Sequence, residues 1–306
     1  MHRDNTVPSF IALVALFILT ISGPAFSQIY LDPNAAVTDR VEDLLSRMTL
    51  AEKIGQMTQA NLTNLASDAE VAGLYLGSIL SGGGAVPDPN TPAVWADTYD
   101  RLQAQALSTR LAIPILYGID AVHGHNNVKG AVIFPHNIGL GAARNPELVR
   151  RAAEITALEV AGTGIDWTFA PCVSAVRDER WGRTYEGFSE DPSVCGELGA
   201  AAVRGMQGTS LADAQRVLAC AKHYAGDGGT VAEVRRDAFH ENQVRLALDQ
   251  GDVRCDEATF RRIHLAPYPP CVAAGVGSIM PSYSSRNGVK CSIHKQLMTD
   301  VLKGEM

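Results

Sequence analysis

Charged and aromatic side chains are concentrated in the segment RDERWGRTYEGFSEDP, which runs from Arg177 to Pro192 and is called the arginine loop below. It contains three arginines and five carboxylates, with Trp181 and Tyr185 between them, and shows neither helical nor strand periodicity. Burying these charges singly would cost several kcal/mol each, so they must be solvated, paired or directed at a polar ligand. The pattern is typical of a functional loop, and a solvated loop with internal ion pairs is the alternative.

Three further groups of polar residues follow short apolar runs. GIDAVHGH contains Asp120, KHYAGDGG begins with Lys222 and His223, and SIMPSYSSRNG contains Met280 and Tyr283. Taken alone, Asp120 is as consistent with capping a loop as with binding a ligand, and Met280 alone would be a core residue. Adjacent strand residues point to opposite faces, so Lys222 and His223 can serve one site only where the strand has ended.

Apolar runs alternate along the chain with helical stretches that carry clear start signals. The expected strands cover residues 77–80, 113–119, 167–173, 217–221 and 277–280. The expected helices cover residues 38–48, 91–109, 145–162, 191–205, 256–264 and 294–306, and a capping box from Thr49 to Glu52 starts one more.

This alternation predicts the fold class. Strands that are apolar throughout are typical of a parallel sheet covered on both faces. The polar groups all follow the carboxyl ends of strands, where a (β/α)8 barrel has its mouth. We therefore predict an α/β fold, a (β/α)8 TIM-like barrel that is incomplete at the C-terminal end, because five or six strands are visible where eight are needed. A doubly wound sheet is less favoured, since no glycine fingerprint for it is present.

Charge and the N-terminus restrict the class of protein. The formal net charge is -7 at pH 7, which argues against nucleic acid and anionic membranes as partners and favours a neutral substrate. Residues 1–27 combine His2 and Arg3 with an apolar run and a small-residue cleavage site, so we predict a signal peptide. The alternative is an uncleaved anchor, but the run is short for a bilayer span. The mature domain, residues 28–306, is expected to be secreted or periplasmic, with no membrane contact after signal cleavage.

The six cysteines include no CxxC pair, which disfavours a zinc site built on them. Cys172 and Cys220 fall inside apolar runs and are expected to be buried thiols.

Together, GIDAVHGH, DERWGRTYEGFSEDP, AKHYAGDGG and SIMPSYSSRNGVK resemble, in this order, the N-terminal barrel domain of glycoside hydrolase family 3. That family comprises secreted β-glucosidases and exo-β-glucanases. The early TLAEKIGQM and the closing LMTDVLKGEM fit the same pattern, so the resemblance covers nearly all of residues 28–306.

The resemblance implies an O-glycosyl hydrolase that removes terminal non-reducing β-D-glucosyl residues from oligosaccharides or glucosides by a retaining mechanism, without a cofactor or metal. It further implies that one group of residues binds sugar hydroxyls and that two more line the pocket: Asp120, Arg180, Lys222 and His223 in the first group, Met280 and Tyr283 in the second. Such a site would penalise a sugar that lacks a matched hydroxyl.

In the family, the nucleophilic aspartate follows the segment that matches LKGEM, and the acid/base glutamate lies in a second domain. Both are therefore expected beyond Met306, in the C-terminal part of the same enzyme, and the fragment alone is expected to be inactive. Glu186 and Asp227 are carboxylates near the motifs, but a catalytic role for either is not favoured. Arg286 stands where many relatives have tryptophan, which puts the aromatic wall of the pocket in question.

Two other functions fit parts of the pattern. One is a catalytically inactive sugar-binding remnant that keeps the pocket without the nucleophile. The other is a metal-dependent barrel hydrolase in which Asp120, His123, His125 and His223 hold zinc, although the arginine loop has no role there.

Overall fold

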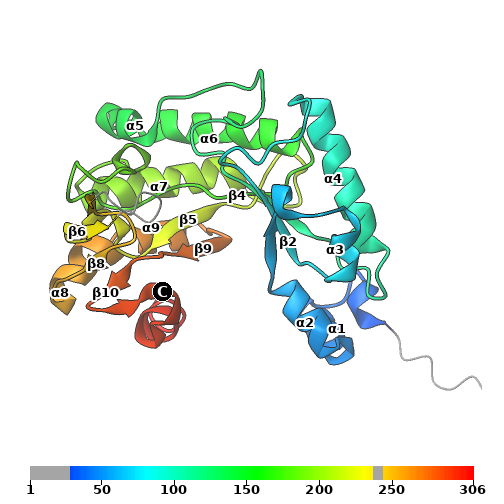
Figure 1. Cartoon of the computed structure of the whole chain (residues 1–306). Helices are drawn as coiled ribbons and strands as arrows, with labels where there is room; N and C mark the ends of the chain where they lie inside the picture. Colours follow the sequence, from blue (N-terminus) through cyan, green and yellow to red (C-terminus); the bar gives the residue numbers. More distant parts are fainter. Residues whose placement is uncertain (1–27, 237–243) are drawn as a thin grey trace, which may run out of the picture. The chain divides into compact units, whose positions relative to one another are not determined.

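A computed structural model describes residues 28–236 and 244–306 (Figure 1). The chain divides into two compact units, residues 1–48 and 49–306. In the described part of the first unit, helix α1 (Val37–Arg47) confirms the helix expected at 38–48. The carboxylate of Asp43 accepts hydrogen bonds from the backbone N–H of Tyr30 at 3.0 Å and from Arg47 at 2.7 Å.

The predicted signal peptide, residues 1–27, lies outside the described residues. Among the helices that are described, none combines the length and the apolar character needed to cross a membrane.

Parallel strands form the frame of the second unit. Four of them pair in sequential order: β1 (Gln59–Asn61), β2 (Ser78–Ser81), β3 (Leu116–Ile119) and β4 (Trp167–Thr168). Strand β5 (Cys220–Tyr224) pairs in parallel with β9 (Ser278–Pro281). Parallel bridges from Trp167 to Leu218 and from Cys172 to Lys222 connect the two groups.

The resulting order, β1-β2-β3-β4-β5-β9, is that of a TIM-like barrel and confirms the predicted fold class. Within the described residues it supplies six of the eight strands that a closed barrel has. All five expected strands are present, while β1 is an addition, because the sequence QAN carries no apolar run.

Start signals in the sequence precede the long helices, whereas the short helices at 69–73, 137–143 and 268–273 have no side-chain cap and were not expected. The helices of the second unit are α2 (Leu50–Gln56), α3 (Ala69–Gly73), α4 (Pro92–Leu107), α5 (Asn137–Ala143), α6 (Pro146–Ala161), α7 (Pro192–Gln207), α8 (Glu257–Phe260) and α9 (Tyr268–Ala273). The side chains of Thr91, Asn145 and Asp191 cap α4, α6 and α7, each directly before a proline. The helix expected at 256–264 is shorter, because α8 passes into a π-helical turn at Arg261–Leu265, and the closing helix is π-helical at Gln296–Val301.

Short strands follow β5 and β9 in the sequence and pair among themselves, antiparallel in two cases and parallel between β8 (Asp252–Val253) and β10 (Ser285–Arg286). Strands β6 (Glu233–Arg236) and β7 (Val244–Ala247) form a hairpin. Strand β10 (Ser285–Arg286) pairs with β8 (Asp252–Val253) and with β11 (Val289–Lys290). Figure 1 shows β6, β8 and β10 in the same region as α8.

The core lies between the strands and the helices that cover them. Its largest fully buried side chains include Trp95, Tyr117, Tyr224, Tyr268, Phe169 and Phe260. All six cysteines are free thiols, and Cys172 and Cys220 are buried as predicted.

Helix α5 fixes the end of the arginine loop by direct backbone contact. A Cβ atom on Gly141 would lie only 1.7 Å from the carbonyl oxygen of Phe188, so the helix and the loop can approach this closely only at a glycine. The side-chain amide of Asn137 also donates to the carbonyl oxygen of Glu186 at 2.8 Å.

We predict opposite effects for two alanine substitutions in α5. Gly141→Ala should lower the free energy of unfolding by about 1–3 kcal/mol, because backbone must move to admit the methyl group. Gly139→Ala is the matched control: its Cβ would meet nothing closer than 3.4 Å, and alanine favours the helix by up to about 1 kcal/mol. Urea unfolding measures both, and equal stability of the two variants would contradict the prediction.

Candidate functional site

A buried ammonium group and a carboxylate from two different strands meet at the carboxyl end of the sheet. Lys222 Nζ, on β5, lies 2.9 Å from Oδ1 of Asp120, the residue after β3. The Lys222 side chain is 3% exposed and that of Asp120 is 38% exposed, so the carboxylate is the more accessible of the two groups. Gly82 leaves room for this contact, because a Cβ there would lie 2.8 Å from Asp120 Oδ2. The Asn127 amide donates to the Asp120 carbonyl at 2.8 Å and holds the loop.

His223 lies in a chain of buried hydrogen bonds. Its Nδ1 is 2.7 Å from Oδ2 of Asp227, and the other carboxylate oxygen of Asp227 accepts from the Ser174 hydroxyl. Its Nε2 is 3.0 Å from Nη2 of Arg183. Ser174, His223 and Asp227 are all buried.

An irregularity in β5 allows the side chains of Lys222 and His223 to contribute to one site. Lys222 pairs with Met280 and Tyr224 pairs with Pro281, so the register shifts at the residue between them. The strand continues past Lys222 to Tyr224. In a regular strand Lys222 and His223 would therefore point to opposite faces and could not serve one site. A bulge re-aims side chains next to functional sites, which explains how the two neighbours both find polar partners.

The arginine loop contributes Arg183 rather than Arg180 to this cluster. Arg183 donates to both carboxylate oxygens of Glu186, at 2.7 and 2.8 Å, besides its contact with His223. Burial opposes ionisation of Glu186, but the hydrogen bond and charge of Arg183 outweigh it and hold the pKa of Glu186 below its ordinary value. Arg180 forms a bidentate pair with Asp178, at 2.8 and 2.5 Å, and its side chain is 58% exposed. The predicted sugar contact of Arg180 stays a prediction.

The two remaining predicted residues are Met280, which lies on β9, and Tyr283, which follows that strand. Met280 lies opposite Lys222 in the register of the two strands and is partly buried. Tyr283 has a largely exposed side chain, while its carbonyl oxygen accepts from Lys290 Nζ at 2.7 Å. The structure thus brings Asp120, Lys222 and His223 to one end of the sheet, with Met280 beside them.

Sequence reasoning missed Arg183 and underrated Asp227. The motif RWGR offers two arginines, and only the fold shows which of them reaches His223. For Asp227 a signal was present, because it stands four residues after His223.

The proposed zinc ligands do not come together. Asp120 pairs with Lys222, His223 pairs with Asp227, and His125 Nε2 bonds the hydroxyl of Thr163 at 3.0 Å. Among residues 28–236 and 244–306, no three His, Cys, Asp or Glu side chains are grouped as metal ligands.

Arg286 has a structural role in place of the expected aromatic residue. It is buried, donates to the Glu257 carboxylate and lies with its guanidinium carbon 4.2 Å from the centre of the Phe260 ring. These contacts connect β10 to α8.

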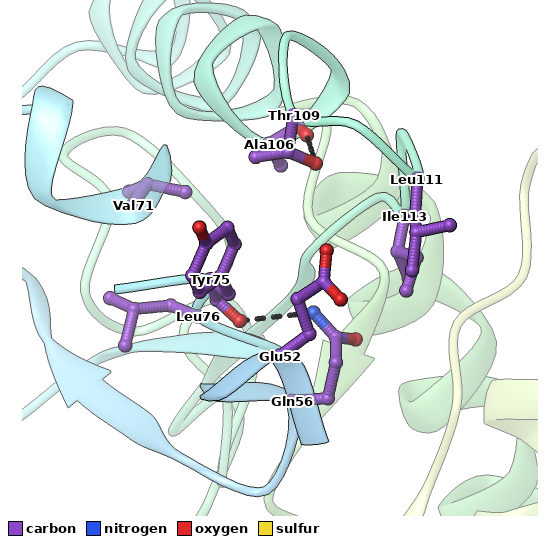
Figure 2. Close-up of a pocket in the computed structure, with 9 residues that line it drawn as sticks. All are labelled: Glu52, Gln56, Val71, Tyr75, Leu76, Ala106, Thr109, Leu111 and Ile113. Atoms are coloured by element: carbon purple, nitrogen blue, oxygen red, sulfur yellow. Dashed lines mark hydrogen bonds between the residues drawn. The ribbon is translucent and has the colours of Figure 1, made fainter. Parts of the chain in front are cut away.

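A small pocket at the opposite end of the strands is lined by Glu52, Gln56 and Tyr75 (Figure 2). Leu76 and Ile113, which precede β2 and β3, also line it, so it lies at the amino ends of the strands. The Gln56 amide donates to the Tyr75 carbonyl oxygen across it at 3.1 Å. Its volume of about 10 Å³ has room for about one water molecule, which excludes it as a substrate site.

Comparisons with known proteins agree with the fold and the motifs. The family model "Glycosyl hydrolase family 3 N terminal domain" matches residues 49–306. The lysosomal beta glucosidase of Dictyostelium discoideum is 35% identical over 290 residues, which cover 87% of this chain and 34% of the relative.

Two solved structures give the same result. The exo-1,3/1,4-beta-glucanase ExoP from a Pseudoalteromonas species is 41% identical with a TM-score of 0.79, over 89% of this chain and 33% of that one. The beta-glucosidase from Listeria innocua in complex with glucose is 28% identical with a TM-score of 0.71, over 88% and 36%. The chain therefore spans about a third of the length of these relatives.

The unequal burial of Lys222 and Asp120 predicts unequal costs of removing them. Asp120→Ala should lower the free energy of unfolding by about 3 kcal/mol, because it leaves an unpaired charge in the interior. Lys222→Met should cost only about 1 kcal/mol, because water can solvate the half-open carboxylate that remains. Urea unfolding of both variants tests this order, and a larger loss for Lys222→Met would contradict it.

His264 predicts a pH dependence of stability. Its ring packs against Gly229, and burial lowers its pKa from 6.5 to about 4, against an opposing effect of the Asp227 charge. The folded protein keeps this ring neutral while the unfolded chain protonates it, so stability is full above pH 6.5 and is lost as the pH falls toward 4.

The substitution His264→Gln should remove this loss. We expect the stability deficit of the variant relative to wild type to be about 2 kcal/mol smaller at pH 5 than at pH 8. The measurement at pH 8 is the control, because there the deficit contains only the lost packing of the ring. An identical deficit at both pH values would show that His264 does not titrate in this range.

Proposed function

The chain belongs to glycosyl hydrolase family 3, and we propose that it supplies the barrel domain of a β-glucosidase-type glycosidase. The observation that carries this proposal is the buried Lys222 ammonium with its half-open Asp120 carboxylate, next to His223 and Arg183. The relatives named above are a beta glucosidase, an exo-glucanase and a beta-glucosidase that was crystallised with glucose.

The polar groups match the hydroxyls of a sugar. The Asp120 carboxylate accepts hydrogen bonds from neighbouring hydroxyls, while Lys222 and Arg183 donate to hydroxyl oxygens with full positive charge. Because both charged donors are already held by carboxylates, little ordering is needed when the sugar enters. We propose a terminal β-D-glucosyl residue as the ligand, with Met280 and Tyr283 beside it and Arg180 as a further contact.

We propose a retaining hydrolysis whose two carboxyl groups come from beyond Met306. A retaining enzyme needs a nucleophile and an acid/base about 5–5.5 Å apart. Glu186 is held by Arg183, and Asp227 by His223 and Ser174, so both carboxylates already have hydrogen-bond partners within the chain. The chain's own residues would then bind and orient the sugar, and the C-terminal part of the same enzyme would complete the chemistry.

We also propose secretion or periplasmic export, on the basis of residues 1–27. A catalytically inactive sugar-binding remnant remains the competing function, and it is distinguished by turnover.

Glucose binding to the full chain, measured by titration calorimetry, tests the proposal. We expect Lys222→Met and Asp120→Asn each to weaken binding at least tenfold, because each removes a charge-assisted hydrogen bond. Lys129→Met is the matched control, since Lys129 is exposed and should leave binding unchanged. Equal binding by all variants, or none by wild type, would refute the site.

A turnover assay on the natural protein that contains this sequence distinguishes the two functions. Release of β-glucose from a β-glucoside, followed by NMR, is expected for a retaining glycosidase. Glucose binding without turnover would instead establish the remnant.

A further inference from the structure

The proposed function uses His223 but leaves the buried carboxylate behind it without a role. Asp227 is 4% exposed and lies on the side of His223 that faces away from Arg183, bonded to Nδ1. A buried carboxylate is costly unless it is paired, so its position next to the histidine of the proposed sugar site points to a purpose.

The hydrogen-bond partners of His223 determine which ring nitrogen carries the proton. An ionised carboxylate only accepts, so Nδ1 must be the N–H that donates to Asp227. A guanidinium only donates, so Nε2 must offer its lone pair to Arg183. Both partners therefore select one neutral tautomer, with the proton on Nδ1.

We propose that Asp227 is a positioning residue that fixes His223 in the Nδ1-protonated tautomer, so that Nε2 accepts a hydrogen bond from a sugar hydroxyl. This inference rests on the proposed function, because it assigns the chemistry of one contact in the same sugar site. An entering hydroxyl accepts from Arg183 and donates to Nε2, which satisfies both groups at once. Arg183 can yield this position because its side chain is one-third exposed.

The surroundings of Asp227 hold it rigidly enough for this role. The Ser174 hydroxyl donates to Asp227 and accepts from the backbone N–H of His223 at 3.4 Å. The turn after Asp227 packs closely, since a Cβ on Gly228 would lie 2.6 Å from the carbonyl oxygen of Ala175. The backbone N–H of Arg177 also donates to the Gly228 carbonyl at 2.8 Å. These contacts fix the orientation of the Asp227 carboxylate, and its hydrogen bond to Nδ1 in turn fixes the orientation of the His223 ring.

The tautomer can be read directly, without any sugar, from the imidazole nitrogen shifts of the full chain labelled with [15N]histidine. His223→Gln assigns the signals. We expect wild type to show a protonated Nδ1 and a bare Nε2 at His223. A wild-type spectrum with the proton on Nε2 would overturn the proposal, whatever the variants do.

Asp227→Asn then tests the positioning. An amide can donate as well as accept, so we expect the Nε2-protonated form to appear and glucose affinity to fall about tenfold. Asp68→Asn is the matched control, because it makes the same change in a surface pair with Arg101. Thermal unfolding shows whether Asp227→Asn folds. If it does not, Ser174→Ala replaces it, because this variant removes the hydrogen bond to Asp227 without changing the charge of the carboxylate. We expect the same appearance of the Nε2-protonated form and the same fall in glucose affinity.

The outcomes separate this inference from the function on which it rests. If wild type binds glucose while Asp227→Asn keeps both the tautomer and the affinity, the positioning role is refuted and the sugar site stands. If wild type binds no glucose, the proposed function fails, and the nitrogen shifts still decide whether Asp227 sets the tautomer. A merely structural role of Asp227 would change stability but leave the tautomer unaltered.

Discussion

The buried ammonium of Lys222 is the constraint on which the carboxyl end of the sheet depends. A charge this enclosed costs several kcal/mol unless an anion reaches it, and the anion comes from the loop after β3. That contact needs β3 and β5 on either side of β4, needs Gly82 at the end of β2, and needs Asn127 to hold the loop. One ion pair therefore links the order of the strands to the position of a carboxylate that a ligand can reach.

His223 is under a similar constraint, because each of its buried ring nitrogens needs a hydrogen-bond partner. The register shift in β5 aims it toward the segment that carries Ser174 and toward the arginine loop. Arg183 is in turn paired with Glu186, so the positive charge beside the histidine has a counter-charge before any ligand arrives. Each charged member of this network has a counterpart, which is why so polar a group can exist at the end of an apolar sheet.

Most of the frame could be predicted because its signals are local. Apolar runs marked the five expected strands, and Thr91, Asn145 and Asp191 marked helix starts that the structure places at the next residue. The two-residue strands β8, β10 and β11 could not be predicted, since a strand that short has no periodicity. The sequence also could not show which of Arg180 and Arg183 contacts the histidine. Both stand in one motif, and what distinguishes them is the contact of Arg183 with His223, forty residues away in sequence.

What makes these side chains a site is the stiffness of the backbone that carries them. The arginine loop touches α5 at Gly141, and the turn after Asp227 touches the segment of Ala175 at Gly228, both at distances that no Cβ would allow. Main-chain contacts of this kind leave few alternative loop conformations, so the entropy of ordering is lost on folding rather than on binding. In the proposed sugar site, the glycines near the motifs would thus act on affinity without touching the ligand, because a loop that could relax by an ångström would let Arg183 and Asp227 release the histidine between them.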